Sequence, residues 1–420
     1  MNIEYLLSRV NTPGNLSEFS RVLDRLGNPQ HRFKCIHIAG TNGKGSVSMM
    51  LAQVLQCAGY KTGLFVSPHV QDITERISVQ GENILPQYFE EALEIIRSIE
   101  EKPLNFFEIL TAAAFLYFDC QGVEYAVLET GLGGRKDPTN VCDPVLSLIV
   151  SVGMDHQYLL GYTLEKIAYE KAGICKTGAP VLSGLLPTKA VEVIEQAAQE
   201  VGTSLLQVRA GEPFFDYAYD FVNGCTELHT LDGEEWMLHA LGPKQTENAC
   251  LVYHAARQLG IGEGAIRLAF ETVHLPARFE IFSLPHQTVI LDGAHNVPAI
   301  KQLMHFWPHT PFAGRAALVC GFMKDKDYAE MLELLYPHFK HIVLTCPPSE
   351  RAADPDVLAA FVPKTQDFTV ERVTDYRQAW AAVSAEPYVL CTGSFYLAGA
   401  VRQLLVQGKE SSTLFRQEND

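Results

Sequence analysis

A glycine-rich loop, Gly40–Ser46 (GTNGKGS), sets the narrowest limits on how this chain can fold. It lies between a mostly apolar, strand-like segment at residues 33–39 and a helical pattern that runs from Val47 until Gly59 ends it. Glycines let backbone N–H groups surround an anion, and Lys44 and the helix N-terminus add positive charge. The order of strand, loop and helix therefore predicts a binding site for a nucleoside triphosphate. A plain glycine-rich turn is the alternative.

Strand-like and helical segments alternate through the first part of the chain, which is typical of a mostly parallel sheet covered by helices on both faces. We expect further strands at residues 61–67, 124–130 and 145–152, and helices at residues 86–101, 108–119 and 246–259. Between Phe214 and Leu241, short alternating runs are separated by Asn-Gly and Asp-Gly dipeptides, which favour tight hairpins. We therefore expect a small antiparallel insert there.

The alternation restarts after the insert and predicts a second α/β domain. Its expected strands lie at residues 288–291, 317–320, 341–345, 368–372 and 388–391. The fold class is then α/β, with an N-terminal doubly wound domain resembling P-loop ATPases and a smaller, Rossmann-like C-terminal domain. We place the boundary so that the domains span residues 1–277 and 278–420. The polar tail at residues 409–420 is expected to fray.

The charge balance excludes several classes of partner. Lys and Arg total 33 against 49 Asp and Glu, for a formal net charge of −16, so no overall basic field can attract nucleic acid or anionic lipid. The ten cysteines form no CxxC pair, which favours free thiols. We see no signal peptide and no apolar stretch near the ~20 residues needed to span a bilayer. We therefore expect a cytoplasmic protein without nucleic-acid or membrane partners.

Hard oxygen ligands follow three of the predicted strands. A triphosphate needs Mg²⁺, and the carboxyl ends of parallel strands meet at one edge of a sheet. Ser67 ends one strand, Glu129 ends another, and Asp155 and His156 follow a third. Each residue alone is a weak signal, but their common place at the sheet edge predicts a magnesium site beside the loop.

Eight motifs in one order give the sequence a specific resemblance. Between residues 40 and 399 the chain carries, in sequence, GTNGKGS, SPHVQDITERI, ETGLGGRKDPTN, SVGMDHQYLLGYTLEKIAYEKAGI, LPARFE, LDGAHN, GFMKDKD and CTGSFYLAG. The set resembles the folylpolyglutamate synthase family of the Mur ligase superfamily, whose members are often also dihydrofolate synthases. The resemblance implies that ATP phosphorylates the terminal carboxylate of a reduced folate. The amino group of L-glutamate then attacks the acyl phosphate.

The resemblance also implies where ATP and its metal ions bind. It assigns the phosphates to Gly40, Thr41, Asn42, Gly43, Lys44, Gly45 and Ser46, and one Mg²⁺ to Ser67 and Glu129. A second Mg²⁺ is assigned to His156 and a carbamoylated Lys171. An unmodified Lys171 that contacts the acyl phosphate is the alternative. Further ATP contacts are implied for Asn248 at the adenine, Arg278 at the γ phosphate, Asp292 near the ribose, and His295. Lys44, Lys171, His156 and Arg278 are the implied catalytic residues.

The remaining implications concern the substrates. The resemblance links Phe107, Glu108 and Thr111 to the folate side of the cleft and Ser394 to glutamate. A core position for the phenylalanine and a helix cap for the serine are the ordinary alternatives. Residues 10–16 do not match the loop with which bifunctional relatives hold dihydropteroate, so that substrate stays open. K⁺ can assist by resemblance only, and we expect a monomer.

Three other functions compete with a folate ligase. They are a Mur-type ligase for a different acid, a P-loop kinase or NTP-driven switch, and a binding protein that has lost catalysis. A kinase gives no reason for Lys171 or for the pair Asp292 and His295 in the second domain. The presence of Lys44, Glu129 and the other implied catalytic residues argues against a lost activity.

Overall fold

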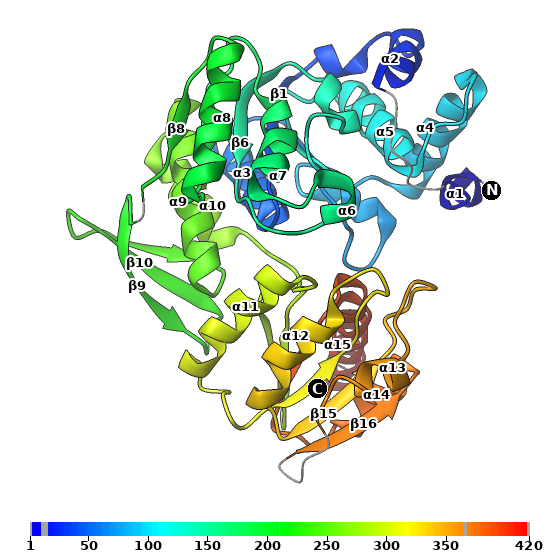
Figure 1. Ribbon diagram of the computed structural model, residues 1–420, viewed down its shortest axis with the longest axis vertical. Helices are drawn as coiled ribbons and strands as arrows, with labels where there is room; N and C mark the ends of the chain where they lie inside the picture. The colour runs from blue at the N-terminus through cyan, green and yellow to red at the C-terminus, as the bar shows by residue number, and fades with distance from the viewer. Residues whose placement is uncertain (1, 10–15, 210, 364–367, 418–420) are drawn as a thin grey trace.

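Two separate sheets divide the chain into an N-terminal and a C-terminal lobe (Figure 1). The computed structural model describes residues 2–9, 16–209, 211–363 and 368–417, with side chains as far as residue 407. Most of segment 10–16, at which we left the dihydropteroate question open, thus lies outside the described residues. Within the described chain no helix is long and apolar enough to cross a membrane.

The sheet of the N-terminal lobe has eight strands, and six of them run parallel to their neighbours. In spatial order they are β4 (Glu82–Asn83), β3 (Ile77–Val79), β2 (Thr62–Phe65), β5 (Tyr125–Glu129), β1 (Lys34–Ala39), β6 (Pro144–Ile149), β7 (Val181–Ser183) and β8 (Leu205–Gln207). Only β3 and β4 are antiparallel. The mostly parallel sheet predicted from the sequence is confirmed, and β1, the strand before the phosphate loop, lies near its centre.

Alternate residues of the central strands point into separate cores on the two faces of this sheet. Ile36 and Ile38 of β1 face a core covered by α3 (Lys44–Cys57), α9 (Pro243–Gln258) and α10 (Glu263–Thr272). Cys35 and its neighbours on the other face pack against α2 (Leu16–Arg25), α4 (Pro86–Ile99) and α5 (Phe106–Cys120). Beyond them, α7 (Leu164–Lys171) and α8 (Thr188–Glu200) cover the β7 side. The short helices α1 (Asn2–Leu7) and α6 (Gln157–Leu160) complete the lobe.

The predicted antiparallel insert is present and joins the two lobes. It consists of β9 (Phe214–Asp220), β10 (Cys225–Thr230) and β11 (Glu235–Leu238). Phe214 at one end packs in the core of the N-terminal lobe. At the other end, Tyr219 and Phe221 contact Phe306 of the C-terminal lobe, with ring centroids 4.9 and 6.0 Å apart. The insert therefore forms one wall of the space between the lobes.

The sheet of the C-terminal lobe has six strands, of which only the first is antiparallel. In spatial order they are β12 (Glu280–Ser283), β13 (Thr288–Leu291), β17 (Tyr388–Thr392), β14 (Ala317–Cys320), β15 (His341–Thr345) and β16 (Thr369–Val373). One face is covered by α11 (Val297–Phe306), α12 (Tyr328–Leu335) and α13 (Pro355–Ala359). The other is covered by α14 (Tyr376–Ala382) and α15 (Phe395–Gln417).

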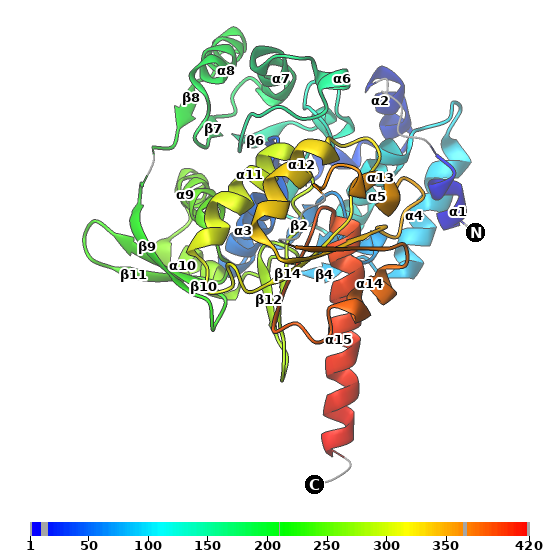
Figure 2. The same cartoon turned by 60° about the horizontal axis from the view of Figure 1, so that its bottom comes forward.

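The structure corrects some expectations about single elements. The sequence analysis missed the short strands β3, β4, β7, β8 and β12, because two to four residues carry too little periodicity to be recognised. The frayed tail was also wrong, because α15 continues to Gln417 and projects from the C-terminal lobe (Figure 2).

Close backbone contact joins α15 to the N-terminal lobe. A Cβ placed on Gly399 would lie 1.7 Å from the backbone oxygen of Val70. Val70, Ala277, Phe395 and Ala398 form a small buried cluster at the same junction. Because the obstructing atom belongs to the backbone, no side-chain rotation can relieve such a contact. Glycine at this position sets how closely the lobes meet.

We predict that Gly399→Ala lowers the free energy of unfolding by about 1–3 kcal/mol, the usual cost of overpacking. Urea denaturation measures the effect. The control is Gly264→Ala in α10, where an added Cβ meets nothing within 4 Å. The control should be neutral or slightly stabilising because alanine favours helix more than glycine does. Equal effects of the two substitutions would contradict the proposed close contact.

Candidate active site

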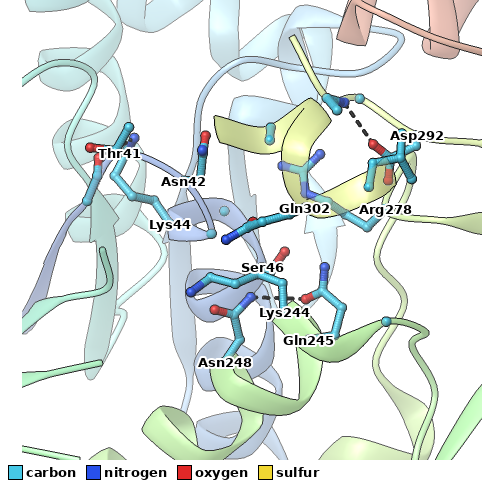
Figure 3. A pocket seen from close by; sticks show the side chains of 18 of the residues that line it. Thr41, Asn42, Lys44, Ser46, Lys244, Gln245, Asn248, Arg278, Asp292 and Gln302 are labelled. Atoms are coloured by element: carbon cyan, nitrogen blue, oxygen red, sulfur yellow. Dashed lines mark hydrogen bonds between the residues drawn. The ribbon is translucent and has the colours of Figure 1, made fainter. Parts of the chain in front are cut away.

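A cavity of about 910 Å³ lies between the two lobes and collects the predicted nucleotide and metal residues. Its lining includes the whole loop Gly40–Ser46 and, from other elements, Ser67, Glu129, Asp155, His156, Lys171, Asn248, Arg278, Asp292 and His295. Figure 3 shows loop residues of the N-terminal lobe facing Arg278 and Asp292 near the lobe junction. Residues separated by more than 250 positions in the sequence thus share one site.

The phosphate loop is held by its own lysine and by the strand beside it. Gly43 has φ of 85°, a conformation that glycine adopts without strain, and α3 begins at the next residue. The Nζ of Lys44 donates to the Gly40 carbonyl oxygen at 3.0 Å. The backbone N–H of Asn42 donates to the hydroxyl of Ser151 at 2.9 Å, and that hydroxyl donates to the Asn42 carbonyl at 2.7 Å. The loop is preorganised around the start of α3.

Glu129 is a buried carboxylate beneath this loop. The backbone N–H of Ser67 donates to its Oε2 at 2.9 Å, and its Oε1 lies 3.9 Å from the Nζ of Lys44. Burial raises the pKa of Glu129, while the nearby charges of Lys44, Arg278 and Arg76 act in the opposite direction. A buried carboxylate among cations can hold a divalent cation.

Asp155 and His156 form the turn that follows β6. His156 has φ of 48°, a strained conformation for a residue with a side chain. Its backbone N–H donates to Oδ1 of Asp155 at 2.8 Å. Desolvation lowers the pKa of His156, which favours the neutral imidazole that a metal ion requires.

Lys171 lies at the end of α7 and is 2% exposed. Burial, followed by the charge of Lys44, lowers the pKa of its amine to about 7. Among the described residues its Nζ has no hydrogen-bond partner. A buried lysine without an acceptor that lines a cavity is a reactive amine rather than part of an ion pair.

Arg278 lies at the junction of the lobes, in strained backbone. Its neighbours Ala277 and Phe279 both have positive φ, 54° and 52°. The carboxylate of Asp292 accepts hydrogen bonds from the N–H of Phe279 at 3.0 Å and of Ala294 at 2.9 Å. The guanidinium stacks 4.0 Å from the centre of the Phe395 ring. These contacts aim Arg278 at Gly45, where an added Cβ would lie 3.3 Å from its Nη2.

Amide side chains line the end of the cavity away from Lys171. The Nδ2 of Asn248 donates to Oε1 of Gln245 at 3.1 Å, and Asn248 lies against Gly43. Figure 3 shows Gln302 of α11 reaching from the C-terminal lobe into the space between Lys44 and Asn248. The paired donors and acceptors of amides suit the edge of a nucleobase.

His295 lines the same cavity from the C-terminal lobe. Its Nδ1 lies 2.9 Å from the Gly293 carbonyl oxygen. Burial lowers its pKa to about 4, so the imidazole is neutral at physiological pH. The site therefore receives a neutral polar group from this histidine rather than a further cation.

Comparison with known protein families and structures agrees with this geometry. The Mur ligase middle domain matches residues 38–255, and the Mur ligase glutamate ligase domain matches residues 277–395. The folylpolyglutamate synthase of Lacticaseibacillus casei is 32% identical, over 96% of both chains. The chain belongs to the folylpolyglutamate synthase family of Mur ligases.

Two solved relatives share the whole architecture of this ligase. The Mycobacterium tuberculosis folylpolyglutamate synthase in complex with ADP has a TM-score of 0.86 at 29% identity, covering 96% of this chain and 97% of its own. An Escherichia coli relative in complex with DHPP and ADP has a TM-score of 0.82 at 30% identity, covering 97% of both chains.

The four residues predicted for the substrates do not line the cavity. Glu108 accepts the backbone N–H of Asn105 in a helix capping box, and the hydroxyl of Thr111 donates to the Phe107 carbonyl oxygen. The Phe107 ring packs directly behind Gly131 of the cavity wall. Ser394 accepts the N–H of Tyr396 at 3.2 Å, as a capping serine does. Their contacts are those of structural residues, and their roles toward substrate stay predictions.

The sequence analysis overlooked several polar residues of this ligase at the lobe interface. Asn296 and Lys326 both contact Asp155 across the interface. Arg76 is buried, donates from Nε to His69 at 3.0 Å, and its charge acts on Glu129. All three lie in the motifs LDGAHN, GFMKDKD and SPHVQDITERI, so the motifs themselves carried the signal.

We predict that Asp292→Asn lowers the free energy of unfolding by about 1–3 kcal/mol, because one amide nitrogen would face a backbone donor and leave it unsatisfied. Thermal or urea unfolding measures the change. Asp220→Asn is the matched control, since exposed Asp220 also accepts two backbone N–H groups, from Val222 and Asn223. A loss at the control as large as at Asp292 would contradict the role of the buried carboxylate.

Proposed function

We propose that this ligase joins L-glutamate to the terminal carboxylate of a reduced folate, at the expense of ATP and through an acyl phosphate. The observation that carries the proposal is the convergence of Lys44, Glu129, Lys171 and Arg278 on one cavity between the lobes. ATP, an acyl acceptor and glutamate are all anions, so a site for them needs cations from several directions. The ADP complexes of the solved relatives support ATP as the nucleotide.

The residues of the chain bind and orient the triphosphate. The backbone of Gly40–Ser46, Lys44 and the start of α3 hold the β and γ phosphates. Arg278 stabilises the charge that develops as the γ phosphoryl group transfers. Asn248 contacts the adenine, while Asp292 and His295 bring the C-terminal lobe to the nucleotide. The closed lobes keep water from the acyl phosphate.

The donors at this site fit magnesium. Among the described residues no group of three or more His, Cys, Asp and Glu side chains could hold a metal ion alone. Mg²⁺ usually binds one or two protein ligands together with phosphates and water, which agrees with that finding. Ser67 and Glu129 would hold one ion, and His156 and a carbamoylated Lys171 a second. The ions would neutralise phosphate charge; K⁺ stays an additional possibility by resemblance.

The surroundings of Lys171 favour carbamoylation. Only a neutral amine reacts with CO₂, and burial keeps a large share of this amine neutral near pH 7. The resulting carbamate supplies the hard, anionic oxygen that magnesium prefers, whereas an ammonium would repel the metal. Carbamoylation would thus turn the one unpartnered lysine described at the cavity wall into a ligand.

The DHPP complex of the Escherichia coli relative supports a second, dihydrofolate synthase reaction on dihydropteroate. The same site would then join L-glutamate to either acid. We propose the domain boundary at residues 277 and 278, where the glutamate ligase domain match begins. The monomeric state and the cytoplasmic location stay predictions.

Phosphate release tests the function directly. With MgATP, tetrahydrofolate and L-glutamate together, we expect release of phosphate and a folate product longer by one glutamate. Omitting any one of the three should stop both. Release without glutamate or folate would favour an NTPase. Product from another acid alone would favour a different Mur-type ligase. Dihydropteroate assayed in parallel decides the second reaction.

We predict that Lys44→Ala abolishes turnover and that Arg278→Ala lowers kcat by the equivalent of ~3 kcal/mol, because a transition-state charge contact is lost. Steady-state kinetics measure both. Arg267→Ala is the control, because Arg267 pairs with Glu234 at the surface, away from the cavity. A near-normal kcat for Arg278→Ala would remove this arginine from the mechanism.

We predict that the wild-type protein carries one carbamate and loses activity in CO₂-depleted buffer, with recovery when bicarbonate is added. Native mass spectrometry should find the mass of one CO₂ in the wild type and not in Lys171→Gln. Lys189→Gln, at an exposed lysine paired with Glu165, is the control and should keep the modification. A wild type that is unmodified and indifferent to bicarbonate would favour the unmodified Lys171.

A further inference from the structure

A chain of polar contacts crosses the lobe interface beside the proposed metal residues. The Nζ of Lys326 donates to Oδ1 of Asp155 at 3.0 Å, and the Nδ2 of Asn296 donates to Oδ2 of the same carboxylate at 2.7 Å. Asn42 and Asn296 also exchange two hydrogen bonds through their amides, at 3.0 and 3.2 Å. Asp155 and Asn42 belong to the N-terminal lobe, and Asn296 and Lys326 to the C-terminal lobe.

These contacts are sheltered from solvent. The side chains of Asp155 and Lys326 are each 11% exposed, and Asn296 is buried. An ion pair in such surroundings is screened far less than a surface pair, and loss of one partner leaves a costly unpaired charge. The charges of Lys326 and His156 and the hydrogen bond from Lys326 outweigh desolvation and lower the pKa of Asp155 below its ordinary value. The contact therefore holds only while the lobes are together.

Each end of the chain of contacts is tied to a functional element. Asn42 is part of the phosphate loop, and its backbone is held by Ser151. Asn296 also caps α11, because its Oδ1 accepts the N–H of Ala299 at 2.9 Å. Asp155 accepts the backbone N–H of His156, the residue held in a strained conformation. Strain of this kind persists only where the surroundings enforce it.

We propose that Lys326 is a positioning residue for catalysis: when the lobes close, Lys326 and Asn296 clamp Asp155, which in turn holds His156 in its strained, productive position. The inference rests on the proposed function, because it assumes that His156 serves the transfer of the phosphoryl group. In the open state Asp155 loses both partners from the C-terminal lobe, and His156 is free to relax. The clamp thus couples chemistry to closure, so ATP is not committed while the site is open to water.

Lys326→Met tests the clamp because it removes the charge and keeps most of the side-chain volume. We expect kcat to fall about 100-fold, the effect of a misplaced catalytic group, with a much smaller change in the KM for MgATP. Lys326→Arg should restore part of kcat. Lys324→Met is the matched control, because Lys324 lies in the same loop, is exposed, and bonds the Glu350 carbonyl oxygen instead. The control should keep wild-type kcat.

A second variant opens the clamp without touching Lys326. Asn296→Asp retains a good helix cap but replaces the donor to Asp155 by a like charge. We expect this variant and Lys326→Met both to scatter X-rays as more extended molecules than the wild type in the presence of a non-hydrolysable ATP analogue. Lys324→Met should scatter like the wild type.

The outcomes of the two proposals are distinguishable. A wild type that joins no glutamate to folate would refute the proposed function, while the scattering experiment would still report on the clamp. If Lys326→Met and Lys324→Met share the same kcat and the same scattering, the clamp is refuted. A parallel rise in KM with unchanged kcat would instead make Lys326 a simple nucleotide contact, which also overturns the proposal.

Discussion

The charge balance around one buried carboxylate governs the site. Glu129 ends a central strand of the N-terminal sheet, directly below the phosphate loop, where Lys44 and Arg278 approach it from the two lobes. Burial alone would make an isolated carboxylate costly, and buried cations without it would repel one another. Together they form a cluster whose members become available to phosphates and metal ions once these enter. The packing of the sheet below the cluster keeps this arrangement in place.

Local strain is concentrated where the two lobes meet. Ala277 and Phe279 on either side of Arg278, and His156 in the turn after β6, adopt conformations that residues with side chains avoid. Each is held by a carboxylate that accepts backbone hydrogen bonds, Asp292 in the first case and Asp155 in the second. The same carboxylates lie at the lobe interface, so the strained groups depend on closure for their positions.

The sequence analysis predicted the larger elements well and the short ones poorly. The strands β13, β14 and β15 have the predicted bounds, because buried parallel strands are continuous apolar runs between turn signals. The edge strands β8 and β12 were missed, because their pairing depends on a neighbouring strand rather than on their own pattern. In the site, the nucleotide and metal residues share one cavity as their positions at strand ends had suggested.

The sequence by itself determined the chemistry of the site, because a glycine loop with its lysine and the ordered motifs require particular residue types wherever the backbone runs. Only the tertiary structure decided which of those residues act together. The bonds of Asp155 to Asn296 and Lys326 join positions 141 and 171 residues apart, a relation that no local pattern records. The burial that turns Lys171 into a neutral amine likewise comes from the packing around α7, since an exposed lysine of the same sequence would stay charged.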